Sequence, residues 1–251
     1  MEKKLEGKVA VVTGGSTGIG LAIAKRFVEH GATVYITGRR KAELEAAVSA
    51  VGSKLEGAVV DSANASQTGE LFRTIGERHG KLDILVANAG GGALLPFGQI
   101  TEEHFDDTFS RNVKGTLFTV QSALPLLGKG SSVILTGSTA ASGGTEAFSV
   151  YAASKAAVRA FARNWIVDLK GRGIRVNTLS PGPIRTPGLV ELVGSDPANQ
   201  QGFLEHLASL IPMGRVGDPD EVAKVAVFLA SEDASFVNGI ELFVDGGMRQ
   251  I

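Results

Sequence analysis

Tyr151 and Lys155 are four residues apart in the segment SVYAASK, a spacing that could support proton transfer. On a helix, residues at i and i+4 lie on one face, about one turn apart. A tyrosine has a pKa near about 10, but a neighbouring lysine cation favours the phenolate. Lowering that pKa to about 7 needs about 4 kcal/mol. Because such pairs are also common on exposed helices, the spacing alone leaves both interpretations open.

Ser138 lies thirteen residues before Tyr151, directly after the apolar run SSVILTG at 131–137. A run of this composition is typical of a buried strand. A hydroxyl at its end could hold a substrate carbonyl while Tyr151 delivers a proton. The chain has only two tyrosines, and one of them stands one turn before a lysine. These three residues predict acid–base chemistry on a carbonyl or alcohol.

A second signal is the segment TGGSTGIG, which follows the apolar run 8–13 and precedes a helical pattern. In such a turn Gly14 would leave the strand sharply, Gly18 would admit a pyrophosphate and Gly20 would allow close helix packing. The amides at the helix start would then meet the anion. A merely glycine-rich loop is the alternative, but the strand before and the helix after favour nucleotide binding.

The segment VYITGRRK indicates which nucleotide is bound. In the NAD-type pattern an acid near the end of this strand bonds the ribose 2′-hydroxyl and would repel a 2′-phosphate. Here Gly38 takes that place, and Arg39 can present a planar fork to the phosphate. We predict NADP(H) rather than NAD(H), with Arg39 as the main determinant and Arg40 as a secondary one. The alternative is a solvated surface pair.

Alternating elements must position these residues. Apolar runs that read as strands lie at 8–13, 33–37, 57–61, 82–88, 131–137, 174–180 and 240–246. Helical patterns cover roughly 18–30, 41–51, 66–79, 101–128, 149–171 and 219–231. This order predicts an α/β fold: a Rossmann-type, doubly wound, seven-stranded, mostly parallel sheet flanked by helices on both faces.

Composition excludes several other classes of protein. The chain has 251 residues, a net charge of −1 and no cysteine, so we expect one domain over 1–251 with no disulfide or thiolate chemistry. We expect no nucleic-acid or membrane partner, because there is neither a basic excess nor an apolar stretch approaching about 20 residues. The four histidines show no metal-ligand spacing, so no metal is expected. A cytoplasmic location is expected.

The segment 183–217 interrupts the alternation with four prolines and follows the sixth predicted strand. Crevices at the carboxyl ends of such strands bind ligands, so we predict a substrate-covering lid there. Between 186 and 214 it holds many apolar residues and no Lys or Arg, which favours an apolar ketone over a polyanionic one. About half of these apolar residues are expected only to pack the lid's own helix.

The motifs T-G-x-x-x-G-I-G and S…Y-x-x-x-K together resemble the short-chain dehydrogenase/reductase family over nearly the whole chain. The resemblance implies that Tyr151 is the general acid/base and that Ser138 orients the substrate. It implies that Lys155 binds the nicotinamide ribose and lowers the tyrosine pKa. Asn112, in RNVKGT, matches the family asparagine that would anchor a water in a proton relay to Lys155.

Further positions match the family's cofactor-binding pattern. ANAG resembles the family's N-N-A-G with Ala87 replacing the first asparagine, and Ser62 stands where an aliphatic residue is more usual. Asp61, at the end of the third predicted strand, would bind the adenine amine. The residues that the resemblance assigns to the cofactor are Gly14, Ser16, Thr17, Gly18, Ile19, Gly20, Arg39, Arg40, Asp61, Ser62, Asn88, Ala89, Gly90, Tyr151, Lys155, Pro181, Gly182, Ile184 and Thr186.

Three functional hypotheses follow. The first is an NADP(H)-dependent reductase of ketones or aldehydes. The second is a 3-oxoacyl-carrier-protein reductase, for which Lys129 and Arg172 could form a docking patch or could equally be solvated surface charges. The third is a non-catalytic NADP-binding sensor, against which the intact Ser138, Tyr151 and Lys155 argue. Family members of this length are commonly homotetramers, with contacts expected at the helix carrying Phe161, Trp165 and Val167 and at the segment VNGIELFVDGG.

Overall fold

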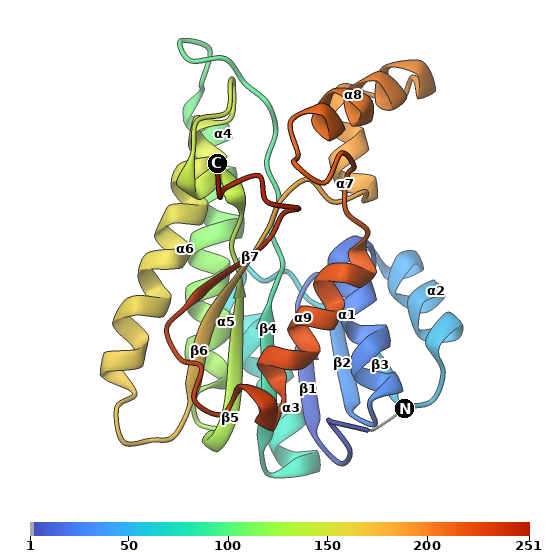
Figure 1. The fold of residues 1–251 in the computed structure, drawn as a ribbon. Coiled ribbons are helices and arrows are strands. Elements are labelled where there is room, and N and C mark those ends of the chain that lie inside the picture. The colour runs from blue at the N-terminus through green and yellow to red at the C-terminus, as the bar shows by residue number, and fades with distance from the viewer. Residues whose placement is uncertain (1–2) are drawn as a thin grey trace.

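A parallel β-sheet forms the centre of the molecule in the computed structural model, which describes residues 3–251 (Figure 1). Its order is β3-β2-β1-β4-β5-β6-β7, and each of the six neighbouring pairs is parallel. The strands are β1 (Val9–Val12), β2 (Thr33–Gly38), β3 (Leu55–Val59), β4 (Leu82–Ala87), β5 (Leu127–Thr136), β6 (Arg175–Pro181) and β7 (Glu241–Val244). The predicted doubly wound sheet of seven strands is confirmed. Residues 1–2 of the predicted domain lie outside the described part.

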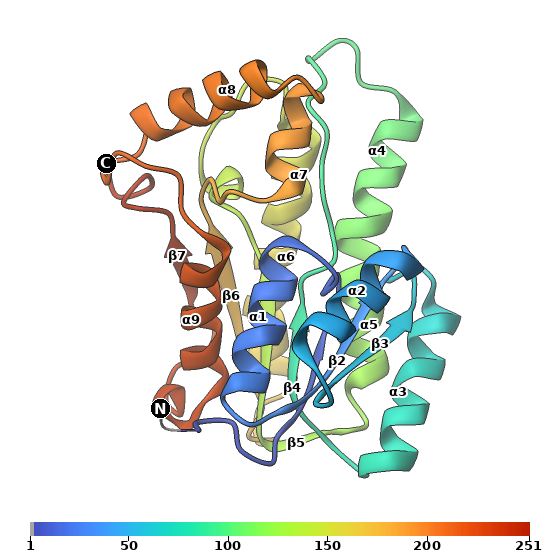
Figure 2. The same cartoon turned by 90° about the vertical axis from the view of Figure 1, so that its right-hand side faces the viewer.

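Helices cover both faces of this sheet (Figure 2). One face packs against α1 (Gly18–Glu29), α2 (Lys41–Val51) and α9 (Pro219–Ala230). The other packs against α3 (Ala65–His79), α5 (Gly115–Ala123) and α6 (Ser149–Asp168). The remaining helical elements are α4 (Glu102–Phe109), η1 (Ser110–Lys114), η2 (Thr139–Ser142), α7 (Pro187–Val190), η3 (Glu191–Val193), α8 (Pro197–Ser209) and η4 (Glu232–Ala234).

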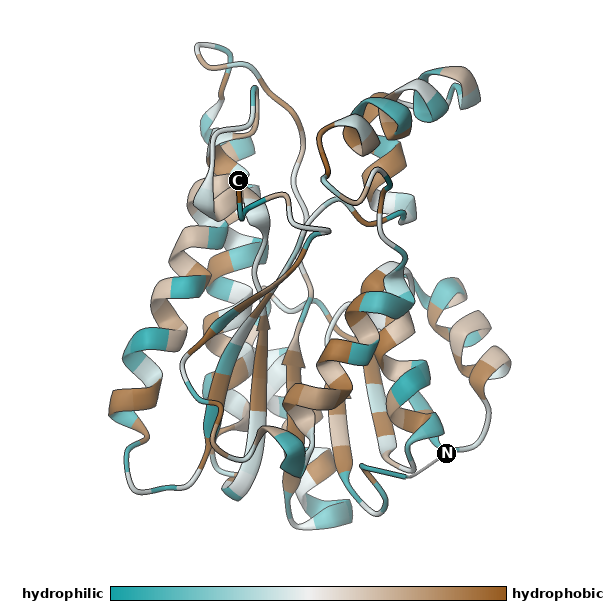
Figure 3. Ribbon diagram, in the orientation of Figure 1, coloured by the Kyte–Doolittle hydropathy of each residue, from teal (hydrophilic) through white to brown (hydrophobic). Residues whose placement is uncertain are grey.

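The two apolar layers follow from the alternation of side chains along each strand. In β1, Ala10 and Val12 point into the layer with α1 and α9, whereas Val9 and Val11 point into the other layer. Every residue of β1 is therefore buried and apolar, as a strand covered on both faces requires. Figure 3 shows this arrangement, with hydrophobic strands inside and hydrophilic residues on the outer surfaces of the helices.

Several predicted boundaries differ from the structure, and the fifth strand begins at Leu127 rather than at 131. The third strand is Leu55–Val59, so it begins and ends two residues earlier than the predicted 57–61. The segment 101–128 is α4, the π-helical turn η1 and α5, and its last residues already belong to β5. Local pattern missed these points because helix ends and π-turns are set by tertiary contacts.

The strand order reverses beside β1, which lies between β2 and β4. After β1 the chain extends the sheet in one direction through β2 and β3. From β4 onward it extends the sheet in the other direction through β5, β6 and β7. A crevice forms where such connections diverge, at the carboxyl ends of the strands. The residues that follow β1, β2, β4 and β5 therefore meet at one edge of the sheet.

The segment 183–217 stands above that edge and contains α7, η3 and α8 (Figures 1 and 2). Its two ends are joined, because Gly217 N donates to Pro183 O at 3.0 Å and Arg185 N donates to Gly217 O at 2.8 Å. Its buried apolar residues are Ile184, Leu204 and Ile211. The predicted excursion thus leaves and re-enters the fold at neighbouring points.

Candidate active site

The turn between β1 and α1 needs glycine for two different reasons. Gly14 and Gly18 have φ values of 62° and 55°, in the left-handed region that favours glycine. At Gly20 a Cβ would lie 2.3 Å from Gly14 O and 2.6 Å from Asn88 Nδ2, so the backbones are too close for any side chain. The turn can hold its shape only with these glycines.

Asn88, just after β4, fastens this turn to the neighbouring strands. Its Nδ2 donates to Thr13 O at 3.0 Å and to Gly14 O at 3.2 Å, and Thr136 Oγ1 donates to its Oδ1 at 3.3 Å. The amides of Asn88 and Ala89 both donate to Thr13 Oγ1. One side chain therefore connects the ends of β1, β4 and β5.

A cavity of about 350 Å³ opens beside the turn. The predicted cofactor residues that line it are Gly14, Ser16, Thr17, Arg39, Arg40, Asp61, Ser62, Ala89 and Gly90. At Gly38 a Cβ would lie 3.1 Å from Ser16 Oγ, so an acidic side chain there would crowd the glycine-rich turn. Position 38, where the NAD-type pattern has an acid, therefore has little room for a side chain and carries no charge.

The two predicted arginines of the cavity, Arg39 and Arg40, differ in their partners. Arg40 Nε lies 3.1 Å from Glu43 Oε1 in an exposed ion pair. Arg39 has no ion-pair or hydrogen-bond partner for its side chain among residues 3–251, although it is exposed and lines the cavity. Only Arg39 therefore keeps its full guanidinium for an anion.

Ser138 and Tyr151 come together at the end of β5. Ser138 precedes the short helix η2, and its hydroxyl accepts a hydrogen bond from Ala140 N at 3.1 Å. Tyr151 lies in the first turn of α6, which packs against η2 and β5. The two side chains are within hydrogen-bonding reach, and this contact lowers the pKa of Tyr151.

Lys155 lies one turn further along α6 and is buried, with 4% of its surface exposed. Its Nζ donates to Thr136 O at 2.8 Å and lies 5.7 Å from the centre of the Tyr151 ring. Burial without a carboxylate partner lowers the pKa of Lys155 to about 8. This lysine can therefore change charge near neutral pH.

The Tyr151 pKa moves in the opposite direction from the prediction. Burial raises the pKa of the phenol above its usual value, and this effect exceeds the lowering caused by Ser138. Ser138 is the group that opposes this rise, and Lys155 does not lower the Tyr151 pKa in this arrangement. The protein alone therefore holds Tyr151 as a protonated phenol, which is the form an acid requires.

Asn112 occupies the π-helical turn η1, where Gly115 N donates to Ser110 O. Its side chain grips the backbone of Gly91: Nδ2 donates to Gly91 O at 3.0 Å, and Oδ1 accepts from Gly91 N at 2.9 Å. The same Nδ2 donates to Ser154 Oγ at 2.9 Å. Single-turn π elements often mark functional sites, and this one turns the amide toward Gly91 and α6.

The predicted cofactor residues at and after the end of β6 lie next to the glycine-rich turn between β1 and α1. Thr186 caps α7 by accepting from Leu189 N at 3.2 Å, and its Cγ2 would lie 3.3 Å from a Cβ at Gly18. Pro181 ends β6, and Gly182 N donates to Val244 O at 3.0 Å. The buried Ile184 side chain belongs to the apolar layer with α1 and α9, as does the partly buried Ile19.

Asp61 does not end the third strand, which stops at Val59. Instead it begins the turn before α3, where its Oδ1 accepts from Ala63 N at 3.0 Å and its N donates to Gln67 Oε1 at 2.8 Å. Ser62 is buried beside it, with 8% of its surface exposed. Both residues still line the cavity.

Lys129 and Arg172, the pair of the predicted docking patch, lie at the other end of β5 from Ser138, and the patch stays a prediction. Lys129 is near the start of β5, whereas Ser138 follows its end, and a strand rises about 3.3 Å per residue. Arg172 is occupied in the structure, since its guanidinium donates to Leu124 O and Leu127 O at 3.0 Å each.

Several residues of the site were missed from the sequence. Thr136 offers only its carbonyl to Lys155, and no side-chain pattern signals that contact. Ser154, which donates to Tyr151 O at 2.7 Å, was readable as the residue between Tyr151 and Lys155 on the same helix. Arg111 and Glu191 both line the cavity, but from segments far apart in the sequence.

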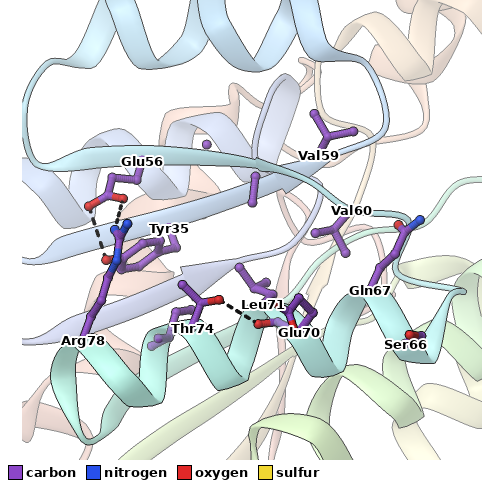
Figure 4. A pocket seen from close by; sticks show the side chains of 13 residues that line it. Tyr35, Glu56, Val59, Val60, Ser66, Gln67, Glu70, Leu71, Thr74 and Arg78 are labelled. Atoms are coloured by element: carbon purple, nitrogen blue, oxygen red, sulfur yellow. Dashed lines mark hydrogen bonds and ion pairs between the residues drawn. The ribbon is translucent and has the colours of Figure 1, made fainter.

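A larger cavity of about 520 Å³ lies between β3 and α3, away from the catalytic residues (Figure 4). Its polar side chains bind one another: Arg78 Nη1 donates to Glu56 Oε2 at 2.7 Å, and the Tyr35 hydroxyl donates to Glu56 Oε1 at 3.3 Å. Within residues 3–251 no group of three His, Cys, Asp or Glu side chains is placed to hold a metal ion, and none of the helices is long and apolar enough to cross a bilayer.

Comparisons with known proteins agree with this arrangement. A family model described as enoyl-(acyl carrier protein) reductase matches residues 14–249. The oxidoreductase asL5 of Sarocladium schorii is 46% identical, with 99% of this chain and 98% of that protein covered. The NADP-dependent (R)-specific alcohol dehydrogenase of Lentilactobacillus kefiri is 36% identical, with 98% of both chains covered.

A solved structure from Brucella melitensis, described as a short-chain dehydrogenase/reductase of the glucose/ribitol dehydrogenase type, superposes with a TM-score of 0.92. It is 32% identical, with 99% of each chain covered. The fold, the glycine-rich turn and these matches define a nicotinamide-dependent oxidoreductase of the Rossmann type. More specifically, this chain belongs to the short-chain dehydrogenase/reductase family.

Proposed function

We propose that the protein is an NADP(H)-dependent oxidoreductase that reversibly reduces a ketone or aldehyde to an alcohol. The observation that carries this proposal is the meeting of Ser138, Tyr151 and Lys155 at the edge of the sheet where the nucleotide cavity opens. The family supplies the reaction class, and the side chains supply the acid, the orienting hydroxyl and the cation.

The lining of the cavity supports the binding of a nucleotide. The described residues place no acidic side chain in the first turn of α1 and no side-chain cap at Thr17, so the first amides of the helix can bind an anion. Gly14 and Gly38 line the cavity without a side chain, and Arg39 lines the same cavity. A bound nicotinamide would supply the hydride donor or acceptor, which no amino-acid side chain can replace.

We assign the proton to Tyr151. Its raised pKa keeps the phenol protonated at neutral pH, so it can donate to a carbonyl oxygen as negative charge develops there. Ser138 would hold the same oxygen, since its hydroxyl already lies beside the phenol. When protonated, Lys155 would stabilise the phenolate that remains after the transfer.

We also infer a preference for NADP(H) from the free Arg39 guanidinium and the missing acid at Gly38. Arg39 can form charge-assisted hydrogen bonds with a 2′-phosphate, whereas Arg40 is already engaged by Glu43. The remaining predicted cofactor residues would surround the dinucleotide along the path from Asp61 through the turn to Thr186.

The segment 183–217 is proposed as the substrate lid, and its apolar residues favour an uncharged substrate. Thr186 and Glu191 support this role, because Thr186 touches the glycine-rich turn and Glu191 lines the cavity. A panel of ketones, 3-oxoacyl thioesters and sugars, each assayed with NADPH and NADH, tests both proposals. Ketone reduction with NADPH is expected, and no turnover of any carbonyl by a protein that binds NADPH would contradict the function.

The homotetramer and the cytoplasmic location remain predictions. Phe161 and Trp165 stack with ring centres 4.8 Å apart, and Val167 on the same helix keeps 68% of its surface exposed. This helix is where we would expect a second copy to pack. Light scattering on the purified protein measures the assembly directly.

A further inference from the structure

Two residues that the predicted constellation lacks touch the Tyr151 side chain. The Phe148 ring stacks on the Tyr151 ring, with centres 4.3 Å apart and planes 23° from parallel. At Gly92 a Cβ would lie 2.5 Å from Tyr151 Cδ2, 2.8 Å from Cγ and 2.9 Å from Cβ. These three atoms are the root of the side chain, so a collision there would have to move the whole ring.

Backbone conformation does not explain the glycine at position 92. Gly92 is not among the residues with positive φ, so another residue could adopt its backbone geometry. The neighbouring Gly91 also lacks a positive φ, but the space around it is open. A Cβ at Gly91 would meet only Arg111 Nη1, at 3.8 Å. Gly92 is therefore small because Tyr151 occupies the volume where its side chain would stand.

Both contacts are braced by the surrounding loops. Ala147 is the one described non-glycine residue with positive φ, at 56°, and its carbonyl accepts from Leu95 N at 2.7 Å. This bond ties the loop before Phe148 to the loop after Gly92. Strained backbone of this kind persists where surrounding contacts hold it, and it gathers at functional sites.

Asn112 links the loop that carries Gly92 to the helix that carries Tyr151. Its side chain holds both backbone groups of Gly91, next to Gly92, and also donates to Ser154 Oγ. Ser154 in turn donates to Tyr151 O at 2.7 Å. One amide thus fixes the segment that presses on the tyrosine ring and the helical turn that carries it.

We propose that Gly92 and Phe148 are positioning residues that hold the Tyr151 ring so that its hydroxyl reaches Ser138, with Asn112 bracing both ends of this arrangement. The inference rests on the proposed function, because it assigns a purpose to the orientation of a proton-donating tyrosine. The inference adds that the position of the Tyr151 hydroxyl depends on the absence of a side chain at Gly92, in a loop outside the S…Y-x-x-x-K motif.

The test compares Gly92→Ala with Gly91→Ala, two identical changes at adjacent positions. Misplacing a reacting group by about 1 Å can cost about 100-fold, so Gly92→Ala should lower kcat for the best ketone of the panel by about that factor. The NADPH dissociation constant should stay within about threefold, because the cofactor cavity is untouched. Gly91→Ala should change neither quantity by more than about threefold.

A second readout does not depend on turnover. The phenolate of Tyr151 can be followed by ultraviolet difference titration, with Tyr151→Phe identifying its signal against that of Tyr35. Burial raises the pKa of Tyr151, so a ring displaced by Gly92→Ala should titrate at lower pH, whereas Gly91→Ala should leave the midpoint unchanged. A wild-type midpoint and a wild-type kcat in Gly92→Ala would overturn the inference.

Phe148 variants cover the case in which Gly92→Ala does not fold. Phe148→Tyr keeps the stacked ring and should retain kcat, whereas Phe148→Leu should lower kcat at unchanged NADPH affinity. Equal kcat in these two variants would also reject the positioning role. An active Tyr151→Phe enzyme would instead reject the proposed function itself, so the two failures are distinguishable.

Discussion

The two cavities that flank the sheet differ in how their polar groups are used. The cavity between β3 and α3 is larger, about 520 Å³ against about 350 Å³, but its charged side chains neutralise one another across the opening (Figure 4). The cavity beside the glycine-rich turn is lined by Arg39, whose side chain has no partner among residues 3–251. Cavity volume alone therefore does not distinguish the candidate site, whereas a polar side chain without a partner does.

The two tyrosines make the same contrast. Tyr35 lies on the wall of the larger cavity, and its hydroxyl is 2.8 Å from His79 Nε2 and 3.3 Å from Glu56 Oε1. The Tyr151 hydroxyl, in contrast, has Ser138 as its hydrogen-bond partner. A satisfied hydroxyl stabilises the fold, and an incompletely satisfied one is available for chemistry.

The largest expected effect separates these tyrosines. Tyr151→Phe should lower kcat by about 1,000-fold, because removal of a general acid typically costs 100- to 10,000-fold, while NADPH binding persists. Tyr35→Phe should keep kcat within about twofold and lower the free energy of unfolding by about 1 kcal/mol. Steady-state assays and urea unfolding measure both. Comparable loss of activity in the two variants would remove the distinction between the cavities.

A glycine from each region gives the next contrast. Gly20→Ala places a Cβ 2.3 Å from Gly14 O, and overpacking of this kind costs about 1–3 kcal/mol, so NADPH affinity should fall about 10- to 100-fold. Gly69→Ala in α3 meets nothing within 4 Å and should raise the free energy of unfolding by about 0.5–1 kcal/mol. Cofactor titration and thermal unfolding report the two outcomes, and unaltered NADPH affinity in Gly20→Ala would contradict the close approach.

Variants of Arg39 and Arg40 test whether the unpaired guanidinium in the cavity binds the 2′-phosphate. Arg39→Ala removes charge-assisted hydrogen bonds worth about 1.5–3 kcal/mol, so the NADPH dissociation constant should rise about 10- to 100-fold while that for NADH hardly changes. Arg40→Ala should shift NADPH binding by no more than about threefold, because exposed ion pairs contribute little. Fluorescence titration with each cofactor measures these constants. An unchanged NADPH/NADH ratio in Arg39→Ala would reject the assignment of the 2′-phosphate site.

The smallest effect concerns Lys155 and pH. Its pKa is lowered to about 8 by burial, so the cation is present below pH 8 and is lost as the pH rises through that value. If the cation assists Tyr151, kcat for ketone reduction should fall about tenfold per pH unit above about pH 8. In Lys155→Arg, which stays charged, the rate should be lower but this decline should be absent. A wild-type profile that is flat to about pH 9 would argue against a role for the lysine charge.

Much of the site could be predicted because its signals are local. The spacing of Tyr151 and Lys155 already places them on one helical face, and the glycines of the first turn stand directly between a strand and a helix. Nearly continuous apolar runs likewise revealed the strands and their order along the chain. Such patterns depend on neighbouring residues only, and a short stretch of chain carries them in full.

Other features were hidden because they join distant segments. Asn112 uses its amide on Gly91 and Ser154, and Thr136 offers Lys155 a backbone carbonyl that every residue possesses. The placement of Lys129 at the far edge of the sheet also depended on where β5 begins. No spacing rule encodes these contacts.

The sequence by itself determined the fold class, the glycine-rich turn and the members of the proposed catalytic constellation, since each is a short pattern with a direct conformational meaning. Only the tertiary structure decided the state of those members. Burial raises the pKa of Tyr151 and lowers that of Lys155, and the ring of Tyr151 fills the space beside Gly92. Desolvation and close contact depend on everything packed around a group, and that surrounding exists only after the chain has folded.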